Sequence, residues 1–322
     1  MTYVSHNRRC GSRRNLPGRL GLTTFVTAVA LMILISSSGA AQEFTFLFNP
    51  PDGISFVETS KLTRITDTGT LGKRTDVSET ETRVTIRRTP TGYTVTHGPI
   101  SAVMTRDDKK IENPVAALLL ETEFSYELDS EGYIQDIRGF DVMIEKMKRV
   151  FPPAVFNALA PILDEEALVN KEVAEWNGQI GGLIGRTARL GEAWTSSDDY
   201  ALPSGEVIRF YTVNRFAEWV KHGARDYVRM VFHYDSDPEG LRGFLDETVG
   251  EMMEAAGVTG EKPQFSGVKL VGEGERLIDP ATMLMHSETV SRTITFESDT
   301  PGLGRTTTVV FETREITFDY TR

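Results

Sequence analysis

The sequence predicts an α+β fold: a large curved antiparallel β-sheet, like a half-barrel, with helices packed on its inner face. Long segments after residue 42 alternate apolar with polar side chains, which is typical of strands with one wet face. Two segments, near 140–176 and 238–256, change to the spacing of amphipathic helices. Turn residues such as Ser130-Glu131-Gly132 join neighbouring strand segments. Sheet and helices therefore form two layers, and a binding cavity is expected between them.

Residues 1–41 have the pattern of a secretory signal peptide. Five arginines precede an apolar run, Leu20–Ile35, and small residues follow it up to Ala41. The run is 16 residues long, whereas a membrane-spanning helix needs about 20 apolar residues. We therefore expect cleavage after Ala40 or Ala41 and export to the periplasm or the exterior. An uncleaved N-terminal anchor is the alternative, and Arg13-Arg14 leaves the twin-arginine route open.

Charge and cysteine content exclude several classes of function. The chain of 322 residues carries 35 basic and 46 acidic side chains, and without residues 1–41 the basic count falls to 30, a net charge of −16. Nucleic acids and anionic membranes are therefore not expected as partners. Cys10, the one cysteine, lies in the expected signal peptide. No disulfide, thiol nucleophile, metal or cofactor is predicted for the exported part.

The first third of that part is predicted to consist of strands. Thr, Val and Ile are frequent in it, and Thr89-Pro90-Thr91-Gly92 predicts a turn. Pro99 is expected to break or end a strand because proline has no N–H to donate. Strands are predicted at 44–48, 54–67, 75–88, 93–97 and 100–105.

The central segment combines a strand with helices. Leu118–Asp129 alternates and predicts a half-buried strand. Phe140–Phe151 follows with an apolar helical face, and Pro152-Pro153 ends that helix. A short helix is expected over Ala154–Ala160. Asp164 is a suitable N-cap for a third helix that reaches Trp176.

The second half repeats the order of strands, helix and strands. Val207–Trp219 and Ala224–Tyr234 predict a hairpin. Ser236-Asp237-Pro238-Glu239 is a helix start, with a capping side chain and proline at the first helical position, and the helix continues to Ala256. Long strands follow over Gly267–Asp319. We expect a single domain over 42–322, or two packed halves joined near the glycine-rich stretch 178–191.

The candidate ligand-lining residues lie on the apolar faces of the two helical segments. Methionine adapts to irregular apolar ligands, although it also fills ordinary cores. These side chains are expected to face the sheet, where an apolar ligand would be bound. They are Met143, Met147, Phe151, Phe244, Met252 and Met253.

Other patterns have simpler structural explanations. No Gly-x-Ser-x-Gly motif occurs, and the glycines of 178–185 match no phosphate-binding loop. The segment His233–Asp237 gathers metal-ligand types, but helix capping by Ser236 or Asp237 explains most of it. Three acidic pairs are expected to be solvated or to lie near helix starts: Asp107-Asp108, Glu165-Glu166 and Asp198-Asp199.

Two short motifs resemble known proteins. Leu190-Gly191-Glu192-Ala193-Trp194 resembles the glycine-acid-alanine-tryptophan motif of exported bacterial families of unknown function. Leu277–Thr282 resembles their strand and turn element, with Met283 in the place of the usual glycine. The order of elements is distantly similar to that of half-barrel lipoprotein and lipid carriers of the periplasm. The resemblance implies a curved sheet around helices and, by analogy, an apolar ligand.

These observations lead to three functional hypotheses. The first is an exported, non-enzymatic envelope protein that binds an apolar small molecule or a lipidated partner such as a lipoprotein. The second is a structural or assembly factor of the cell envelope. The third is a hydrolase with dispersed catalytic residues, which would need a serine or paired carboxylates near His97 or His233. No stable membrane span is expected after cleavage.

Overall fold

The structure is a computed structural model, and it describes residues 43–112, 114–153, 156, 163–201, 207–223, 225–255, 257, 262–300 and 304–321. Gln42–Arg322 forms one compact unit. The expected signal peptide lies outside the described residues, as does the predicted helix 154–160 apart from Phe156. No helix in the described part of the chain is both long and apolar enough to span a membrane.

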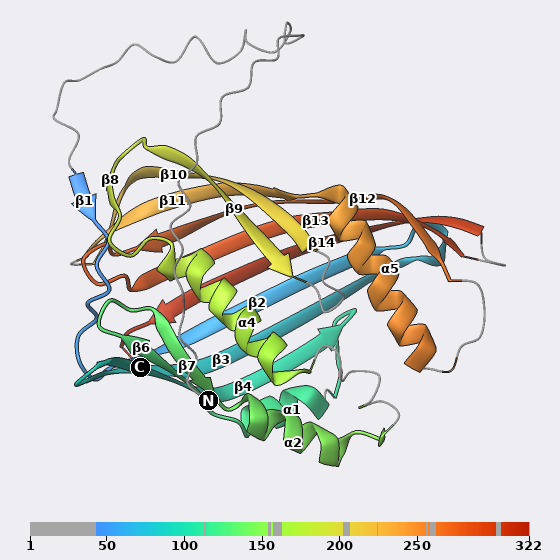
Figure 1. Ribbon diagram of the computed structural model, residues 1–322, viewed down its shortest axis with the longest axis horizontal. Helices are drawn as coiled ribbons and strands as arrows, with labels where there is room; N and C mark the ends of the chain where they lie inside the picture. The colour runs from blue at the N-terminus through green and yellow to red at the C-terminus, as the bar shows by residue number, and fades with distance from the viewer. Residues whose placement is uncertain are drawn as a thin grey trace, which may run out of the picture. The chain divides into compact units, whose positions relative to one another are not determined.

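A 12-stranded antiparallel sheet dominates the unit, which confirms the predicted fold class (Figure 1). The strand order is β7-β6-β4-β3-β2-β14-β13-β12-β11-β10-β9, and β5 pairs with β4. The strands are β2 (Ile54–Asp67), β3 (Lys73–Thr89), β4 (Gly92–Arg106), β5 (Lys109–Lys110), β6 (Phe124–Asp129), β7 (Ile134–Arg138), β9 (Ala193–Ala201), β10 (Val207–His222), β11 (Arg225–Ser236), β12 (Gln264–Ile278), β13 (Met285–Thr300) and β14 (Gly304–Asp319).

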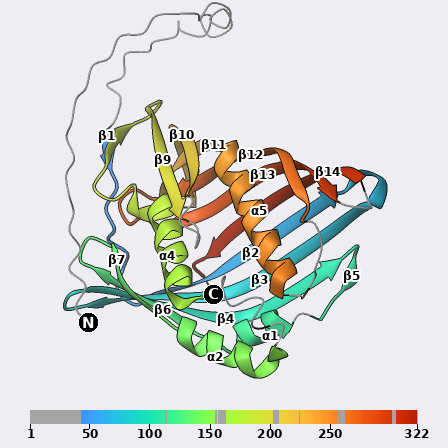
Figure 2. The same ribbon diagram turned by 45° about the vertical axis from the view of Figure 1, so that its right-hand side comes forward.

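Helices lie on the concave face of this sheet, as Figure 2 shows for α4 and α5. A separate two-stranded sheet pairs β1 (Glu43–Thr45) with β8 (Thr187–Arg189). The remaining elements are η1 (Gly69–Leu71), α1 (Pro114–Leu120), α2 (Phe140–Val150), α4 (Glu165–Trp176), the π-helical turn η3 (Asn177–Gly181) and α5 (Pro238–Ala255).

The topology explains why α4 lies over the middle of the sheet. Strands β2 to β7 form one meander and β9 to β14 another, and the two meanders meet where β14 pairs with β2. Strands β7 and β9 consequently lie at opposite edges of the sheet. The chain that joins them carries α2, α4 and η3, and it crosses the concave face from one edge to the other (Figure 1).

Three clusters of buried side chains form the core. The largest lies between the sheet and α4 and includes Phe46, Phe56 and Phe216. The second surrounds α2, and the third lies between α5 and the strands β10 and β12. The α5 helix begins as predicted, because the Asp237 carboxylate accepts hydrogen bonds from the N–H groups of Glu239 (3.3 Å) and Gly240 (3.2 Å).

The predicted start of a strand at Leu118 is wrong. Leu118–Leu120 forms the end of α1, because the Ala- and Leu-rich run before it favours helix. The Thr122 hydroxyl donates to the Leu118 carbonyl (3.0 Å), and the strand begins only at Phe124. Pro99 interrupts the regular pairing of β4, as predicted, without ending the strand. It lies at a β-bulge opposite the Glu81/Thr82 step, where a missing N–H is tolerated.

Candidate functional site

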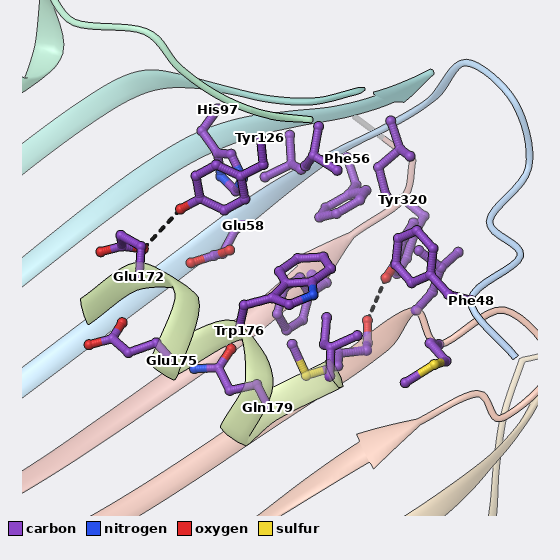
Figure 3. Close-up of a pocket in the computed structure, with 18 of the residues that line it drawn as sticks. Phe48, Phe56, Glu58, His97, Tyr126, Glu172, Glu175, Trp176, Gln179 and Tyr320 are labelled. Atoms are coloured by element: carbon purple, nitrogen blue, oxygen red, sulfur yellow. Dashed lines mark hydrogen bonds between the residues drawn. The ribbon is translucent and has the colours of Figure 1, made fainter. Parts of the chain in front are cut away.

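A cavity of about 210 Å³ lies between α4 and the concave face of the sheet (Figure 3). Its walls come from both meanders, since β2, β3, β4, β6 and β14 all contribute, and its roof is formed by α4 and η3. The lining side chains are Phe48, Phe56, Glu58, Val84, Ile86, Val95, His97, Tyr126, Glu172, Glu175, Trp176, Gln179, Ile180, Met283, Leu284, Met285, Arg314, Phe318 and Tyr320.

Two hydrogen bonds hold α4 over this cavity. The Tyr126 hydroxyl on β6 donates to the Glu172 carboxylate (2.9 Å). One helical turn later, the Trp176 indole N–H donates to the carbonyl of Gly132 (3.0 Å). Gly132 must be glycine here, because a Cβ atom would lie 2.4 Å from the Phe48 ring and its φ is +101°. The turn between β6 and β7 is thereby packed beneath the end of α4.

A buried arginine fixes η3 to the sheet. Arg276 on β12 donates to the carbonyl of Gln179 (2.8 Å) and to the Glu288 carboxylate (2.8 Å). The side chains of Arg276 and Glu288 are only 6% and 3% exposed. Additional hydrogen bonds help to offset the desolvation of an ion pair at this depth, and the η3 carbonyls supply some of them, although Arg276 Nε has no partner among the described residues. The end of the cavity roof is therefore tied to the charge pair below it.

Met283 reaches the cavity through an unusual backbone. It follows the turn at Asp279, whose carbonyl accepts from the Met283 N–H (2.7 Å), and it has a φ of +59°. Left-handed backbone is costly for a residue with a Cβ. The side chain is 2% exposed and lines the cavity. Glycine would adopt this backbone conformation at lower cost, but methionine adds a buried apolar side chain that packs in the core.

Two polar groups of the cavity have no hydrogen-bond partner. Burial raises the pKa of Glu58, the positive charge of Arg314 lowers it in part, and Glu288 raises it. Among the described residues nothing donates a hydrogen bond to Glu58, since the Arg314 Nε–H donates to Ser60 Oγ (3.3 Å). His97 Nε2 is buried without a partner in the same part of the chain, and burial lowers the pKa of His97 to about 4.

The other acidic groups of the cavity are paired. Lys171 lies 2.6 Å from a Glu175 oxygen and 3.6 Å from a Glu172 oxygen. Burial and the neighbouring Glu172 raise the pKa of Tyr126, which keeps its hydroxyl a donor. Three carboxylates and two cations therefore act on the cavity, and Glu58 is the carboxylate with no close partner among the described residues.

The predicted ligand-lining residues lie elsewhere, in two separate groups. Met143 and Met147 are buried around α2, with Phe151 packed against them. Phe244 packs between α5 and the sheet. Met253 is half-buried on α5, and the Met252 side chain lies outside the described residues. None of the five described side chains lines the cavity under α4.

A band of ion pairs also lies on the concave face. Glu312 on β14 accepts from Arg64 and Arg292, and its side chain is only 4% exposed. Asp76 on β3 continues the band with Arg106 (2.7 Å). Tyr234 nevertheless packs against both the cluster under α4 and the cluster under α5. An acidic residue on the buried parity of a strand, such as Glu58 two residues after Phe56, is the sequence signal that could have indicated the site.

The residues considered for a metal site or a hydrolase site are only partly brought together. Asp237 caps α5, and His233 lies on the outer face with Nδ1 3.4 Å from a Glu273 oxygen. His222 and His286 stack with ring centroids 3.8 Å apart. No group of three or more metal-ligating residues occurs in the described part of the chain. The cavity supplies His97 and carboxylates, as the hydrolase hypothesis requires, while its described lining contains no serine, threonine or cysteine.

The glycine-acid-alanine-tryptophan motif holds β8 and β9 together. Glu192 accepts from Arg186 (2.7 Å), and the Arg186 guanidinium lies 3.9 Å from the ring centroid of Trp194. Gly191 has a φ of +82° and donates its N–H to the Phe216 carbonyl (2.7 Å). The motif therefore stabilises the chain where it leaves η3 for the far edge of the sheet.

Comparisons with known proteins assign no family. No protein-family model matches the chain, and no curated protein matches it. A structure described as lipid–protein interactions in lipovitellin aligns with a TM-score of 0.39 and 10% identity, over 84% of this chain and 25% of that chain. DynF from the dynemicin biosynthesis pathway of Micromonospora chersina aligns with a TM-score of 0.19 and 8% identity, over 88% and 87%. This chain thus spans a quarter of the lipovitellin chain.

Proposed function

We propose that the protein binds a small, mostly apolar ligand, without chemical conversion, in the cavity between α4 and the sheet. The observation that carries this proposal is the lining: apolar side chains such as Val84, Val95 and Phe318 surround the space, and Glu58 and His97 face it without partners. Concave, mostly apolar sites with a few convergent polar groups are typical of ligand pockets. Groups with shifted pKa values cluster at such sites.

The cavity volume limits the size of the ligand. The cavity has a volume of about 210 Å³. Pockets for drug-sized ligands are larger, at about 300–1,000 Å³. A whole lipid therefore does not fit. A short amphiphile fits, as does the end of one chain of a lipidated partner.

The expected affinity is modest. Burying a CH₂ group contributes about 0.8 kcal/mol, so a six-carbon chain contributes about 5 kcal/mol before the cost of ordering the ligand. A Kd near 1 mM corresponds to about 4 kcal/mol. Titration by nuclear magnetic resonance (NMR) suits binding in this range.

A short alcohol tests the proposal. Hexan-1-ol is titrated into the protein and the methyl signals of valine are followed. The Val84→Phe variant fills the cavity from β3, where Val84 is 2% exposed. The Val213→Phe variant makes the same change on the outer face of β10, where Val213 is 50% exposed. Wild type and Val213→Phe should bind hexan-1-ol, and folded Val84→Phe should lose the binding.

The opposite result would remove the proposal. If wild type shows no saturable shifts, the cavity does not bind such ligands. If Val84→Phe binds hexan-1-ol as well as wild type does, the binding site lies elsewhere. Far-ultraviolet circular dichroism and the urea midpoint of each variant establish that it is folded before the titration is interpreted.

We also propose that the protein works outside the cytoplasm, as an exported envelope protein. Support comes from the pattern of residues 1–41, with its basic start, apolar run and small residues before Ala41. The intact mass of protein recovered from the periplasmic or extracellular fraction should correspond to a chain that begins after Ala40 or Ala41. A full-length mass in the cytoplasmic fraction alone would contradict export.

A further inference from the structure

The polar end of the ligand can be inferred from the unpartnered groups, on the assumption that the proposed cavity binding is correct. Glu58 projects from the middle of β2 into the cavity. The positive charge of Arg314 acts on Glu58 from a distance, but no ion pair or hydrogen bond joins the two side chains, and the Arg314 Nε–H donates to Ser60 Oγ. Glu58 is partly buried, and a carboxyl group that loses part of its hydration without gaining a hydrogen-bond partner is costly. A ligand that donates hydrogen bonds would remove this cost.

The charges around Glu58 favour a cationic donor. Glu172 and Glu175 face the same cavity from α4, and Lys171 is shared between them. Arg314 is the remaining cation among the described lining residues. His97 is neutral near pH 7 because burial lowers its pKa to about 4. An incoming positive charge would therefore meet more negative than positive charge.

Aromatic rings surround the same position. In Figure 3 the Glu58 carboxyl group lies between the rings of Tyr126 and Trp176. The Glu58 charge also acts on the Tyr126 hydroxyl and contributes to raising its pKa. The faces of tyrosine and tryptophan rings attract ammonium groups, with an energy that grows when water is excluded. Carboxylate and rings together form an environment suited to an organic cation.

We propose that the polar end of the ligand is a protonated amine, bound by the carboxylate of Glu58, with its first carbons against the rings of Tyr126 and Trp176. The side chain of His97 lines the same cavity. The apolar remainder of the ligand then lies against Val84, Val95 and their neighbours. The ligand class is thus a short alkyl or aryl amine.

The proposal fixes the sign of the pH dependence. Burial raises the pKa of Glu58, and an ammonium group binds its ionised form. At pH values at which Glu58 is protonated in the free protein, binding of the amine therefore releases a proton. The affinity for the amine consequently rises as the pH increases through the pKa of Glu58. A carboxylate ligand would instead accept a hydrogen bond from protonated Glu58, and its affinity would fall as the pH rises.

Three probes of equal chain length distinguish these cases: hexylamine, hexan-1-ol and hexanoate, titrated by NMR at pH 5.5 and pH 8. At pH 8 hexylamine should bind about tenfold or more tightly than hexan-1-ol, and hexanoate should bind most weakly. The Glu58→Gln variant should bind hexylamine and hexan-1-ol equally. The Glu79→Gln variant, which changes an exposed glutamate on the outer face of β3, should retain the preference.

Each outcome of these titrations supports or contradicts the amine assignment. If hexan-1-ol binds and hexylamine binds no more tightly, or hexanoate binds most tightly, the amine assignment is wrong while the cavity remains a binding site. If none of the three binds, the proposed function fails, and the amine assignment fails with it. The pH dependence is measured on wild type, so the assignment stays testable even if Glu58→Gln does not fold.

Discussion

The Tyr126 hydroxyl donates a hydrogen bond of 2.9 Å to the Glu172 carboxylate and thereby connects the sheet to the helix above it. Tyr126 lies on β6, near one edge of the sheet, and Glu172 lies on α4, in the chain that crosses to the other edge. With the bond from Trp176 to Gly132, it holds the roof of the cavity in place. Loss of this contact should therefore loosen α4 before it loosens the sheet.

We expect the Tyr126→Phe variant to lose about 1 kcal/mol of stability, the usual net contribution of one hydrogen bond. Hydrogen exchange should quicken more at the amides of α4 than at those of β2 and β14, because α4 has fewer contacts with the rest of the unit. Tyr211→Phe is the matched control, since Tyr211 is 49% exposed on β10. Equal exchange in α4 and the central strands would show that the bond does not hold the roof.

The pair of Arg276 and Glu288 should respond differently to single and double substitution. Glu288→Gln leaves a buried guanidinium without its anion, and we expect a loss of about 3–5 kcal/mol in urea unfolding. The double variant Arg276→Met/Glu288→Leu should lose less, because no charge stays buried. Lys61→Gln, which breaks an exposed pair with Glu79, should stay within about 1 kcal/mol of wild type. A double variant less stable than Glu288→Gln would contradict this reasoning.

His97 should make stability depend on pH below neutrality. Its pKa is about 4 in the folded state, because of burial, against the ordinary value of 6.5. Between these values the unfolded chain binds one more proton, so the free energy of unfolding falls as the pH falls, by up to about 1.4 kcal/mol per pH unit. His97→Gln should show a smaller dependence between pH 6.5 and 4.5, and exposed His233→Gln should not. Identical dependence in all three proteins would mean that His97 charges freely in the folded state.

The Met283→Gly variant compares the cost of the left-handed backbone at this residue with the stability gained from packing its side chain. Glycine removes a left-handed cost of about 1–2 kcal/mol, but truncation of a buried methionine costs about 2–5 kcal/mol. We therefore expect a net loss of stability and a larger cavity. Asp108→Gly, at an exposed residue with a φ of +62°, should stay within about 1 kcal/mol of wild type or exceed it. A more stable Met283→Gly protein would show that the side chain contributes little.

Much of the fold could be predicted because local patterns decide it. The strand Ile54–Asp67 and the helix starts near Phe140 and Pro238 follow from alternation, helical spacing and capping, which act within a few residues. Leu118–Leu120 could not be assigned correctly, since a short apolar run suits strand and helix alike. The pairing of β14 with β2 depends on contacts across the whole chain, and no local pattern specifies it.

The site was harder to predict than the fold. Apolar faces on α2 and α5 were identified, yet Met143 and Phe244 lie in different clusters and neither lines the cavity. The cavity instead depends on α4, whose apolar pattern is weak. Glu58 and Trp176 both line the cavity. They are far apart in the sequence and come together only because the chain crosses the sheet, so no local pattern identifies them as one site.

The most direct test of the account is the location of a bound ligand. Intermolecular nuclear Overhauser effects should be measured between hexan-1-ol and the protein at saturating alcohol. If the cavity binds the alcohol, contacts should join the alkyl chain to the methyl groups of Val84 and Val95 and to the indole of Trp176, all of which line the cavity. Contacts confined to the outer face, at Val213 and Phe311, would contradict this account.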